Sequence, residues 1–224
     1  FNLAFFSCLK IMIKLVESDY SASIFYDCLR KLGYPNQILP NSISPLKRGM
    51  RLFGPAWPIS GKITKNSTVH ETLLSWTDFL SKAPSEHVII CQPNDNTIAH
   101  MGELSAETLK HKGVKGYLVD GGSRDISSII QMNFPVFCKY STTADVAGRW
   151  VVDSMGSPIS IGKVLISNGD HIVGDEDGIV VVPKKIINKT LKLVKEYTNT
   201  EDKVRSAIQS GMDPKEAYIK YGKF

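Results

Sequence analysis

Apolar residues recur at helical spacing in two segments of the first half of the chain. In residues 18–32 they follow a run of capping residues, and Gly33 and Pro35 end the predicted helix. The apolar positions of this helix are Ile24, Phe25, Cys28, Leu29 and Leu32. Residues 69–80 show the same periodicity. The pattern therefore predicts two amphipathic helices.

The middle of the chain alternates short apolar runs with helical segments. The runs HVIIC, GYLVD and PVFC start at His87, Gly116 and Pro135, and residues 102–112 and 124–132 between them have helical spacing. Short continuous apolar runs are typical of buried parallel strands. We therefore predict a β-α-β-α-β unit. Its crossovers are right-handed, and the loops at the carboxyl ends of its strands form the binding crevice.

Polar and turn-forming residues mark the remaining elements. Residues 35–50 are rich in Pro, Asn and Ser and predict a loop, and residues 51–60 predict a short strand that two prolines confine to an edge or a strand end. Short strands with Gly turns after Ser141 predict an antiparallel region. A long helix over residues 183–197 and a helical stretch near 201–210 complete an α/β chain.

The chain shows no internal repeat and no linker between independent domains. We therefore expect one domain over residues 12–224, with a helical tail at about 184–224. Residue 1 is Phe and Met12 opens the first domain-like segment, so residues 1–11 are interpreted as an N-terminal extension. A chain of 224 residues with 42% hydrophobic composition is long enough to bury a core without disulfides.

Cysteine spacing and hydropathy indicate the cellular compartment of the protein. Cys8, Cys28, Cys91 and Cys138 are far apart with no CxxC pair, which argues against a disulfide framework or a short-spaced zinc site. No apolar run approaches the roughly 20 residues that a bilayer-spanning helix needs. The apolar start is also too short for a signal peptide. We therefore predict a soluble cytoplasmic protein without a membrane partner.

The net charge of +5 comes from the C-terminal tail, because residues 184–224 carry 10 basic and 5 acidic side chains. A nucleic-acid-binding surface is expected to gather Lys, Arg and aromatic residues on one face. Here the lysines alternate with Ile186, Ile187, Leu191 and Val194, which resemble the buried side of a helix. The pattern favours a solvated helix face over a nucleic-acid site.

The sharpest candidate for chemistry is the segment Asp120-Gly-Gly-Ser-Arg-Asp125, at the junction of a predicted strand and helix. Its two glycines allow the backbone to approach a ligand closely, and Arg124 with the next helix's amides can bind a carboxylate or an enolate oxygen. Asp125 is a hard oxygen ligand for a divalent cation. The alternative is a tight turn with a capping Asp and a structural ion pair.

A second candidate is the segment His100-Met-Gly-Glu-Leu-Ser-Ala106. Gly102 opens a helix whose first amides can face an anion, and Glu103 can bind or orient a metal-bound water. Alternatively, Glu103 is a first-turn acid that stabilises the helix dipole. The predicted topology places both segments at the same edge of the sheet, so they strengthen each other.

Other polar residues favour structural roles. The acidic run Asp175-Glu176-Asp177 between two apolar runs predicts a turn more strongly than a cation site. His171 lies beside this turn, and His100 is placed closer to a ligand, yet a lone histidine is more often structural. The cysteines show no readable partnership with His and Asn, so no nucleophile is predicted.

Several of these segments resemble a known family. GELSAETLKHKGVKGYLVDGGSRDISSI from Gly102 and GDHIVGDEDGIVVVP from Gly169 are similar to signatures of the RraA-like family. That family contains the 4-hydroxy-4-methyl-2-oxoglutarate aldolases and the proteins named regulator of ribonuclease activity A. Further similar positions are Asp27-Cys28-Leu29, Gly54-Pro55-Ala56, the PVF run at Pro135, Gly148-Arg149, and the ending from Glu201 to Gly222. The resemblance runs from about Ser18 to the C-terminus.

The resemblance implies a fold and an activity. The fold is an α-β-β-α sandwich related to the phosphohistidine swivelling domain, assembled as a homotrimer or homohexamer. The activity is that of a class II aldolase, a lyase that uses Mg²⁺ or Mn²⁺ to cleave 4-hydroxy-2-oxo acids to pyruvate and that also decarboxylates oxaloacetate. The enolate chemistry needs a cation and a guanidinium, and no Schiff-base lysine.

The resemblance also implies roles for residues. Arg124 binds the substrate and stabilises the pyruvate enolate, Asp125 holds the metal, and Glu103 positions a metal-bound water. The substrate carboxylate is bound by backbone amides of Gly102, Glu103, Leu104 and Ser105. Glu201 is a weaker match to an acidic residue that reaches in from a neighbouring subunit.

One position departs from the family pattern. The family's aldolases usually carry an acidic residue three positions after the Asp of the Arg-Asp pair, and this chain has Ser128 there, beside Ser127. A missing carboxylate weakens Mg²⁺ binding, shifts it to Mn²⁺, or leaves a protein that binds 2-oxo acids without efficient cleavage. Two interpretations stay open: a metal-dependent lyase, and a non-catalytic binding protein that regulates a partner such as a ribonuclease.

Overall fold

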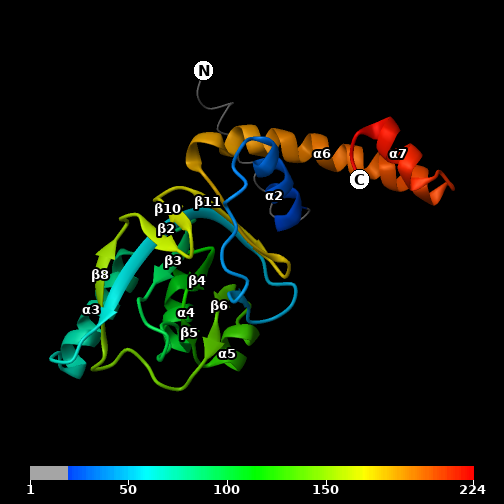
Figure 1. Ribbon diagram of the computed structural model, residues 1–224. Helices are drawn as coiled ribbons and strands as arrows, with labels where there is room; N and C mark the ends of the chain where they lie inside the picture. The colour runs from blue at the N-terminus through cyan, green and yellow to red at the C-terminus, as the bar shows by residue number, and fades with distance from the viewer. Residues whose placement is uncertain (1–19) are drawn as a thin grey trace.

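The computed structural model of the protein describes residues 20–224. The predicted extension, the domain start at Met12 and Cys8 lie outside these residues. At the centre is an eight-stranded mixed sheet in the order β1-β6-β4-β3-β2-β11-β12, with β8 also paired to β2 (Figure 1). Its parallel core consists of β2 (Leu52–Ile63), β3 (Val88–Gln92), β4 (Gly116–Val119) and β6 (Val136–Cys138). The predicted α/β class is confirmed.

Three helices cover one face of the parallel strands. They are α3 (Val69–Lys82), α4 (Glu103–His111) and α5 (Ile126–Gln131). Side chains such as Phe79 of α3 and Leu109 of α4 pack with Ile89 and Tyr117 of the sheet in one buried cluster. The predicted β-α-β-α-β unit is therefore present, and the loops after β3 and β4 leave the sheet at the same edge.

Strands form the second layer against the other face. The hairpin β11 (His171–Asp175) and β12 (Gly178–Val182) and the hairpin β9 (Ile159–Ile161) and β10 (Val164–Ile166) bury apolar side chains with Val88, Ile90 and Leu118. The sheet curls toward closure, because the segment before β1 (Ser44–Pro45) pairs with β12 and β1 itself pairs with β6. The remaining strands are β8 (Trp150–Met155) and the short parallel pair β5 (Gly122–Ser123) and β7 (Tyr140–Ser141).

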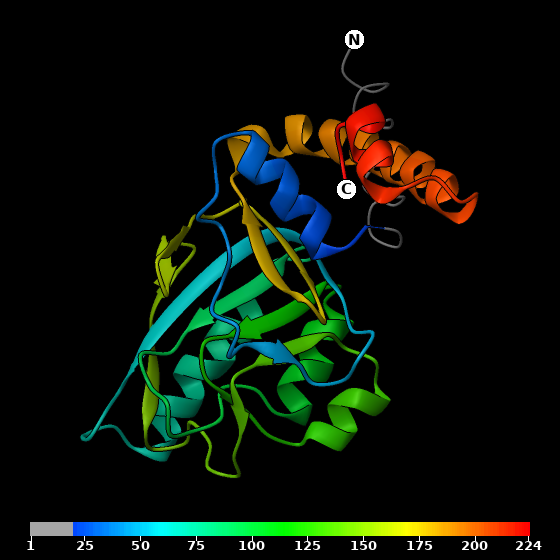
Figure 2. The same cartoon turned by 45° about the vertical axis from the view of Figure 1, so that its right-hand side comes forward.

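Two helices pack on the outer side of the β11–β12 hairpin and complete the predicted α-β-β-α order. They are α2 (Ala22–Lys31) and α6 (Ile187–Gln209), which follows the short 3-10 turn η1 (Lys184–Ile186). Phe25 and Leu29 of α2 join Leu191 and Val194 of α6 in a third buried cluster with Val180. In Figure 2 these helices lie beyond the hairpin, and the outer half of α6 projects from the body with α7 (Pro214–Tyr221).

The C-terminal helices differ from the prediction. The two stretches predicted over residues 183–197 and 201–210 form one 23-residue helix, α6. No Gly or Pro interrupts the chain between Pro183 and Gly211, so nothing ends the helix at the polar residues between the two stretches. The predicted helical tail includes α7, but no separate helix is predicted there, although Asp213 caps α7 through its side chain and Pro214 occupies its first turn.

The strand predicted at an edge is central. β2 spans 12 residues and pairs with β3, β8 and β11. Pro55 precedes Ala56, where pairing with β3 begins. The Ala56 amide donates to the Asp170 carbonyl, on the side of β2 that pairs with β11. The nitrogen of Pro58, two residues later, faces the same side. There it lies between the end of the pairing with β11 and the start of the pairing with β8 at Ile59. Both prolines therefore occupy positions where no ladder hydrogen bond is lost.

Candidate functional site

The two loops predicted to converge at the sheet edge are joined by backbone contacts. The His100 amide donates to the Gly122 carbonyl at 2.9 Å, and the Arg124 amide donates to the Met101 carbonyl at 2.8 Å. Ala99 and Gly122 also form a parallel bridge. The loop around His100 and the loop around Gly122 are thus held together as one unit at the carboxyl ends of β3 and β4. This is the crevice that the topology of a parallel sheet provides for a ligand.

The glycine pair of this unit serves the protein's own packing. A Cβ on Gly122 would lie 2.4 Å from the Tyr140 ring and 2.7 Å from the Ile98 carbonyl oxygen, and a Cβ on Gly121 would lie 2.9 Å from Pro93. Both glycines are buried. The expectation that they admit a ligand is therefore corrected: they admit neighbouring loop residues, and the ligand-facing groups come from the next positions along the chain.

Arg124 is held between two carboxylates at the mouth of this crevice. Its Nη1 donates to Asp145 Oδ2 at 2.8 Å, and its Nε lies 3.5 Å from Asp125 Oδ2. The side chains of Arg124, Asp125 and Asp145 are 39%, 41% and 34% exposed. Because a guanidinium carries five N–H groups, donors remain for a ligand after these contacts. Their orientation is fixed before any ligand arrives.

Asp125 has an unusual backbone conformation, φ 55° and ψ 38°, in the left-handed region that Asp tolerates better than most residues. It precedes α5 without capping that helix. Its Oδ2 instead accepts the Glu103 amide of α4 at 3.0 Å. Gly102 makes this approach feasible, since a Cβ there would lie 2.8 Å from Asp125 Oδ2 and 3.1 Å from Arg124 Nε.

This hydrogen bond affects the predicted carboxylate cradle. The first intrahelical bond of α4 is Ala106 N to Gly102 O, so the preceding amides have no partner within the helix. The Glu103 amide is engaged by Asp125. Leu104 and Ser105 follow in the same turn at the wall of the cleft, and their amides are the ones that remain to meet an anion.

A cleft of about 470 Å³ opens beside Arg124. The charged residues that line it are Arg124, Asp125, Asp145 and Glu103, and most of the other lining residues are apolar. The residues that line it are Leu73, Trp76, Thr77, Leu80, Ala99, His100, Met101, Gly102, Glu103, Leu104, Ser105, Thr108, Arg124, Asp125, Asp145 and Val146. Its volume falls within the range of small-molecule sites. All predicted binding residues except Glu201 line this one cleft.

His100 is a packed neutral side chain. It is 0% exposed, its ring lies against Trp150 with centroids 5.1 Å apart, and its Nε2 is 3.8 Å from Asp95 Oδ2. Burial lowers the pKa of His100 to about 4, although the Asp95 carboxylate partly opposes this shift. Burial raises the pKa of Asp95, but hydrogen bonds from Thr97 and Ile98 outweigh it and the net shift is downward. At pH 7 the pair thus carries one negative charge.

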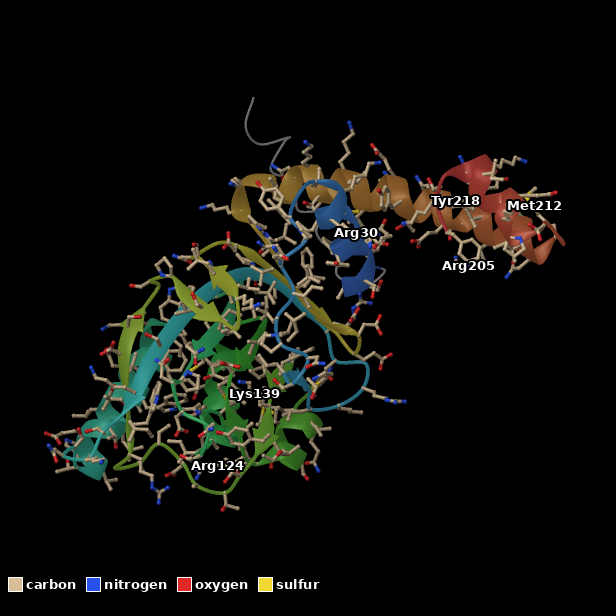
Figure 3. All side chains as sticks on the ribbon, viewed as in Figure 1. Arg30, Arg124, Lys139, Arg205, Met212 and Tyr218 are labelled. Carbon is tan, nitrogen blue, oxygen red and sulfur yellow. The ribbon has the colours of Figure 1, made fainter. Side chains whose placement is uncertain are left out.

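Two residues that the resemblance singled out lie outside the cleft. Glu201 is on α6 and forms an ion pair with Lys223 at 2.7 Å. Figure 3 shows Arg124 far from Arg205, which lies one turn beyond Glu201 on that helix. Ser128 lines a separate hollow between α4 and α5 that it shares with Glu103. Glu103 is therefore the residue common to both depressions.

The weaker sequence candidates have structural roles. Asp175 accepts the Ala22 amide at 2.7 Å and the Asp177 amide at 2.9 Å, so the acidic run forms a turn that holds the start of α2. Burial lowers the pKa of His171. Burial also raises the pKa of Cys28 and Cys91 to about 12, which keeps these thiols protonated.

Sequence reasoning missed two members of the site. Asp145, which orients Arg124, lies in an irregular segment between β7 and β8 with no local motif. Its only signal is its place three residues before the Gly148-Arg149 pair. Trp76 of α3 donates through Nε1 to Ser105 Oγ at 2.9 Å and forms one wall of the cleft. Trp76 lies in the helix predicted over residues 69–80, and it belongs to both the core and the cleft.

The carboxylates at the cleft determine which kind of divalent-cation site the protein can form. Residues 20–224 contain no group of three or more His, Cys, Asp or Glu side chains placed to hold a metal. Asp125 does offer a cleft-exposed carboxylate. Mg²⁺ retains several waters and is commonly held by one or two carboxylates together with substrate oxygens. The residues thus fit a largely hydrated cation and do not fit a closed protein cage.

The fold and cleft define an α/β protein with a candidate small-molecule site where two loops meet at the sheet edge. Residues 22–181 match the family described as "RraA-like: Aldolase/RraA", and the chain belongs to this family. The same part of the chain contains all the predicted site residues except Glu201. Within residues 20–224, no helix is both long and apolar enough to cross a bilayer.

Relatives and a solved structure agree with this assignment. The chain is 30% identical over 181 residues to the "putative 4-hydroxy-4-methyl-2-oxoglutarate aldolase" of Halalkalibacterium halodurans, covering 81% of this chain and 83% of that one. It is 30% identical over 204 residues to protein DlpA of Legionella pneumophila, covering 87% of this chain but only 31% of DlpA. The crystal structure of Streptomyces coelicolor RraAS2, of the RNase ES inhibitor RraA family, superposes with a TM-score of 0.76 at 21% identity over 87% and 96% of the two chains. This last likeness concerns the fold.

Proposed function

We propose that the protein is a divalent-metal-dependent carbon–carbon lyase that cleaves 4-hydroxy-2-oxo acids to pyruvate and also decarboxylates oxaloacetate. The observation that carries this proposal is Arg124. It is oriented by Asp145 and Asp125 and lies at the mouth of a cleft beside the first turn of α4. A fixed guanidinium beside unpaired helix amides suits a substrate with a carboxylate next to a ketone.

These groups account for the proton and the electron pair that move in a retro-aldol cleavage. A base in the cleft takes the proton of the substrate's 4-hydroxyl, the C3–C4 bond breaks, and C4 becomes a carbonyl. The electron pair of that bond forms the C2–C3 double bond of the pyruvate enolate, whose negative charge lies on the C2 oxygen. Arg124 donates to this oxygen and lowers the barrier. Glu103, at the cleft wall, takes up the hydroxyl proton directly or through a water and returns it to C3, which gives pyruvate.

A bound Mg²⁺ or Mn²⁺ supplies further stabilisation of the enolate charge. We assign Asp125 as its protein ligand, because this carboxylate is exposed in the cleft and adjoins Arg124. In this proposal the Leu104 and Ser105 amides bind the substrate's C1 carboxylate, while the Glu103 amide keeps Asp125 in place.

The active form of this proposal is a homotrimer or homohexamer in which Glu201 serves a neighbour's cleft. Glu201 is 36% exposed on a helix that projects from the body (Figure 1). Light scattering checks the assembly. A particle of monomer mass, 24.8 kDa, at micromolar concentration contradicts it.

The second candidate function is a binding protein that regulates a partner such as a ribonuclease. The observation that favours it is Ser128, which occupies the position where the resemblance to the family's aldolases implies an acidic residue. Such a protein needs the cleft to bind and not to turn over substrate.

Pyruvate release separates the two functions. Purified protein is incubated with oxaloacetate and with 4-hydroxy-2-oxo acids, in Mg²⁺, in Mn²⁺ or in excess chelator, and pyruvate is measured. The lyase releases pyruvate with either metal and stops in chelator. Release no faster than in protein-free solution with the same metal contradicts the lyase and favours the binding protein.

A further inference from the structure

The wall of the cleft carries a hydroxyl group on the first turn of α4, the side chain of Ser105. Its Oγ accepts the indole N–H of Trp76 at 2.9 Å, and both residues line the cleft together with Arg124. An indole N–H can only donate, so this hydrogen bond occupies a lone pair of the hydroxyl oxygen and leaves the hydroxyl proton for another acceptor. The Ser105 hydroxyl is therefore a hydrogen-bond donor whose oxygen is held in place by Trp76.

The threonine hydroxyls of the cleft use their protons within their own helices. Thr108 donates to the Leu104 carbonyl at 2.7 Å, and Thr77 donates to the Leu73 carbonyl at 2.8 Å. Such bonds to the preceding turn are a common arrangement for a hydroxyl in a helix. Within the part of the chain that the structure describes, no carbonyl or carboxylate accepts the Ser105 hydroxyl. Its proton is thus available to a ligand in the cleft.

The hydroxyl lies next to the amides that remain free at the start of α4. A side chain on a helix leans toward the N-terminus of that helix, so Ser105 Oγ extends over the turn that contains the Leu104 and Ser105 amides. These amides form the positive end of the helix dipole. The Arg124 guanidinium lines the same cleft. The hydroxyl, the amides and the guanidinium all donate hydrogen bonds, which is what a carboxylate requires.

Trp76 is itself held by the core of the protein. It is 6% exposed, and its ring packs edge-on against Phe79 at 5.0 Å and Trp150 at 5.8 Å. Because these contacts prevent the indole from turning away, the acceptor side of the Ser105 hydroxyl stays fixed. The O–H bond is then restricted to directions that point away from Trp76.

We propose that the Ser105 hydroxyl binds the substrate carboxylate next to the ketone, and that Trp76 is the positioning residue that orients this hydroxyl. The inference rests on the proposed lyase function, because it adds a side-chain donor to the amides assigned to the same carboxylate. A hydrogen bond from a hydroxyl to a carboxylate is charge-assisted and about twice as strong as a neutral one. In the alternative interpretation, the bond between Trp76 and Ser105 only joins α3 to α4.

Pyruvate, the proposed product, carries this carboxylate and tests the subsite without turnover. We expect Ser105→Ala to raise the Kd of pyruvate, measured by calorimetry in Mg²⁺, by about 10-fold, the effect of losing one hydrogen bond to a charged group. An unchanged Kd in Ser105→Ala, or no binding of pyruvate to the wild-type protein, overturns the proposal.

Ser75→Ala is the matched control. Ser75 precedes Trp76 on α3, its Oγ accepts the Val152 amide at 3.0 Å, and it is not among the described residues that line the cleft. The variant should lower the melting temperature, because the Val152 amide loses its acceptor, and it should leave the Kd of pyruvate unchanged. Equal increases of the Kd in Ser75→Ala and Ser105→Ala overturn the proposal, since a loss of stability then explains both.

Trp76→Phe tests the positioning role. It keeps a ring in the core and removes the indole N–H, so the Ser105 hydroxyl can rotate. We expect the Kd of pyruvate to rise by about 3-fold in the wild-type background and to stay unchanged in the Ser105→Ala background. Equal increases in both backgrounds show that Trp76 affects binding through packing alone and overturn its positioning role.

Turnover of oxaloacetate distinguishes the failure of this inference from the failure of the lyase function. The carboxylate next to the ketone keeps its charge in the transition state, so Ser105→Ala should raise KM about 10-fold and change kcat by less than about 2-fold. If the wild-type protein turns over oxaloacetate and Ser105→Ala keeps the wild-type KM, the lyase function stands and the Ser105 subsite is wrong. If pyruvate binding depends on Ser105 but no 2-oxo acid is turned over, the subsite stands and the lyase function fails.

Discussion

Two aspartates, Asp125 before α5 and Asp175 at the turn between β11 and β12, make the same local contact in different surroundings. Asp125 accepts the first amide of α4 at 3.0 Å, and Asp175 accepts the first amide of α2 at 2.7 Å. Each carboxylate stabilises the positive end of a helix dipole. Asp175 is 9% exposed, and its second oxygen accepts the Asp177 amide. Both its oxygens are thus used by the protein itself.

Asp125 can still bind a ligand, whereas Asp175 cannot. Its side chain is 41% exposed, it adjoins a guanidinium, and it faces a cleft. The comparison teaches that an acid at a helix N-terminus says little about function. The neighbouring cation and the access to a ligand make the difference, and both depend on loops that meet only in the folded chain.

The largest expected effect is on the cation that distinguishes the two sites. Arg124→Lys keeps the charge but loses the planar fork that bridges Asp145 and the enolate, so transition-state stabilisation should fall by about 2–4 kcal/mol, measured as kcat/KM for pyruvate release. Arg205→Lys, on the remote part of α6 in Figure 3, is the control and should keep full activity. Wild-type turnover in Arg124→Lys contradicts the assigned site.

The second prediction is that a substitution of Asp175 affects stability, whereas a substitution of Asp125 affects activity. Asp175→Ala leaves the buried Ala22 amide and the more exposed Asp177 amide without acceptors, and it should lower the free energy of unfolding by about 1–3 kcal/mol with little change in kcat/KM. Asp125→Asn should remove most metal-dependent activity and leave the melting temperature nearly unchanged, because a neutral amide is a poor ligand for a hard cation. Denaturant titration and turnover on the same preparations check both. Loss of folding in Asp125→Asn favours a purely structural ion pair.

The sequence predicts the parts of this fold that depend on local pattern. The β-α-β-α-β unit and the convergence of the segments around Gly102 and Arg124 follow from apolar runs and helical spacing. The family assignment follows from the motifs themselves. Local pattern also assigns the run at Asp175 to a turn. In each of these cases the determining contacts lie close together in sequence or are imposed by the topology of parallel strands.

The errors concern contacts between distant segments. The sequence predicts β2 at an edge because its two prolines have no amide N–H to donate. In the structure, Pro55 and Pro58 lie where the pairing with a neighbouring strand begins or ends, so a central strand accepts them. The partner of Gly122 is Tyr140, and the partner of Arg124 is Asp145. No spacing rule links these pairs, because the helix α5, the strand β6 and several loops separate their members in the chain.

The third prediction concerns His100, whose amide ties the two loops together. Its pKa of about 4 in the folded chain lies below the ordinary histidine value of 6.5, so the unfolded chain binds more protons between these values and stability falls as pH falls through this window. The protonation of His100 alone should lower the free energy of unfolding by about 2 kcal/mol between pH 7 and pH 5.

His100→Phe removes the titrating group while keeping a ring against Trp150, and the slope of unfolding free energy with pH should become shallower. His171 is also buried with a lowered pKa, so the wild-type slope contains both histidines and the difference between the two proteins measures His100. Identical slopes in wild type and variant show that His100 is hydrated or charged in the folded chain.

The smallest expected effect tests whether Asp145 acts on the reaction only through Arg124. Asp145→Asn keeps an oxygen that can accept from Arg124 Nη1 but removes the charge, and these side chains are one third exposed, so kcat/KM should fall by about 1 kcal/mol, roughly 5-fold. The hydrogen bond from the Ala147 amide to the other oxygen of Asp145 is then lost, which should lower the free energy of unfolding by about 1 kcal/mol. A double-mutant cycle with Arg124→Lys gives the sharper measurement. If Asp145 positions Arg124, its substitution should have almost no further effect once Arg124 is Lys, and fully additive losses place Asp145 in direct contact with the substrate instead.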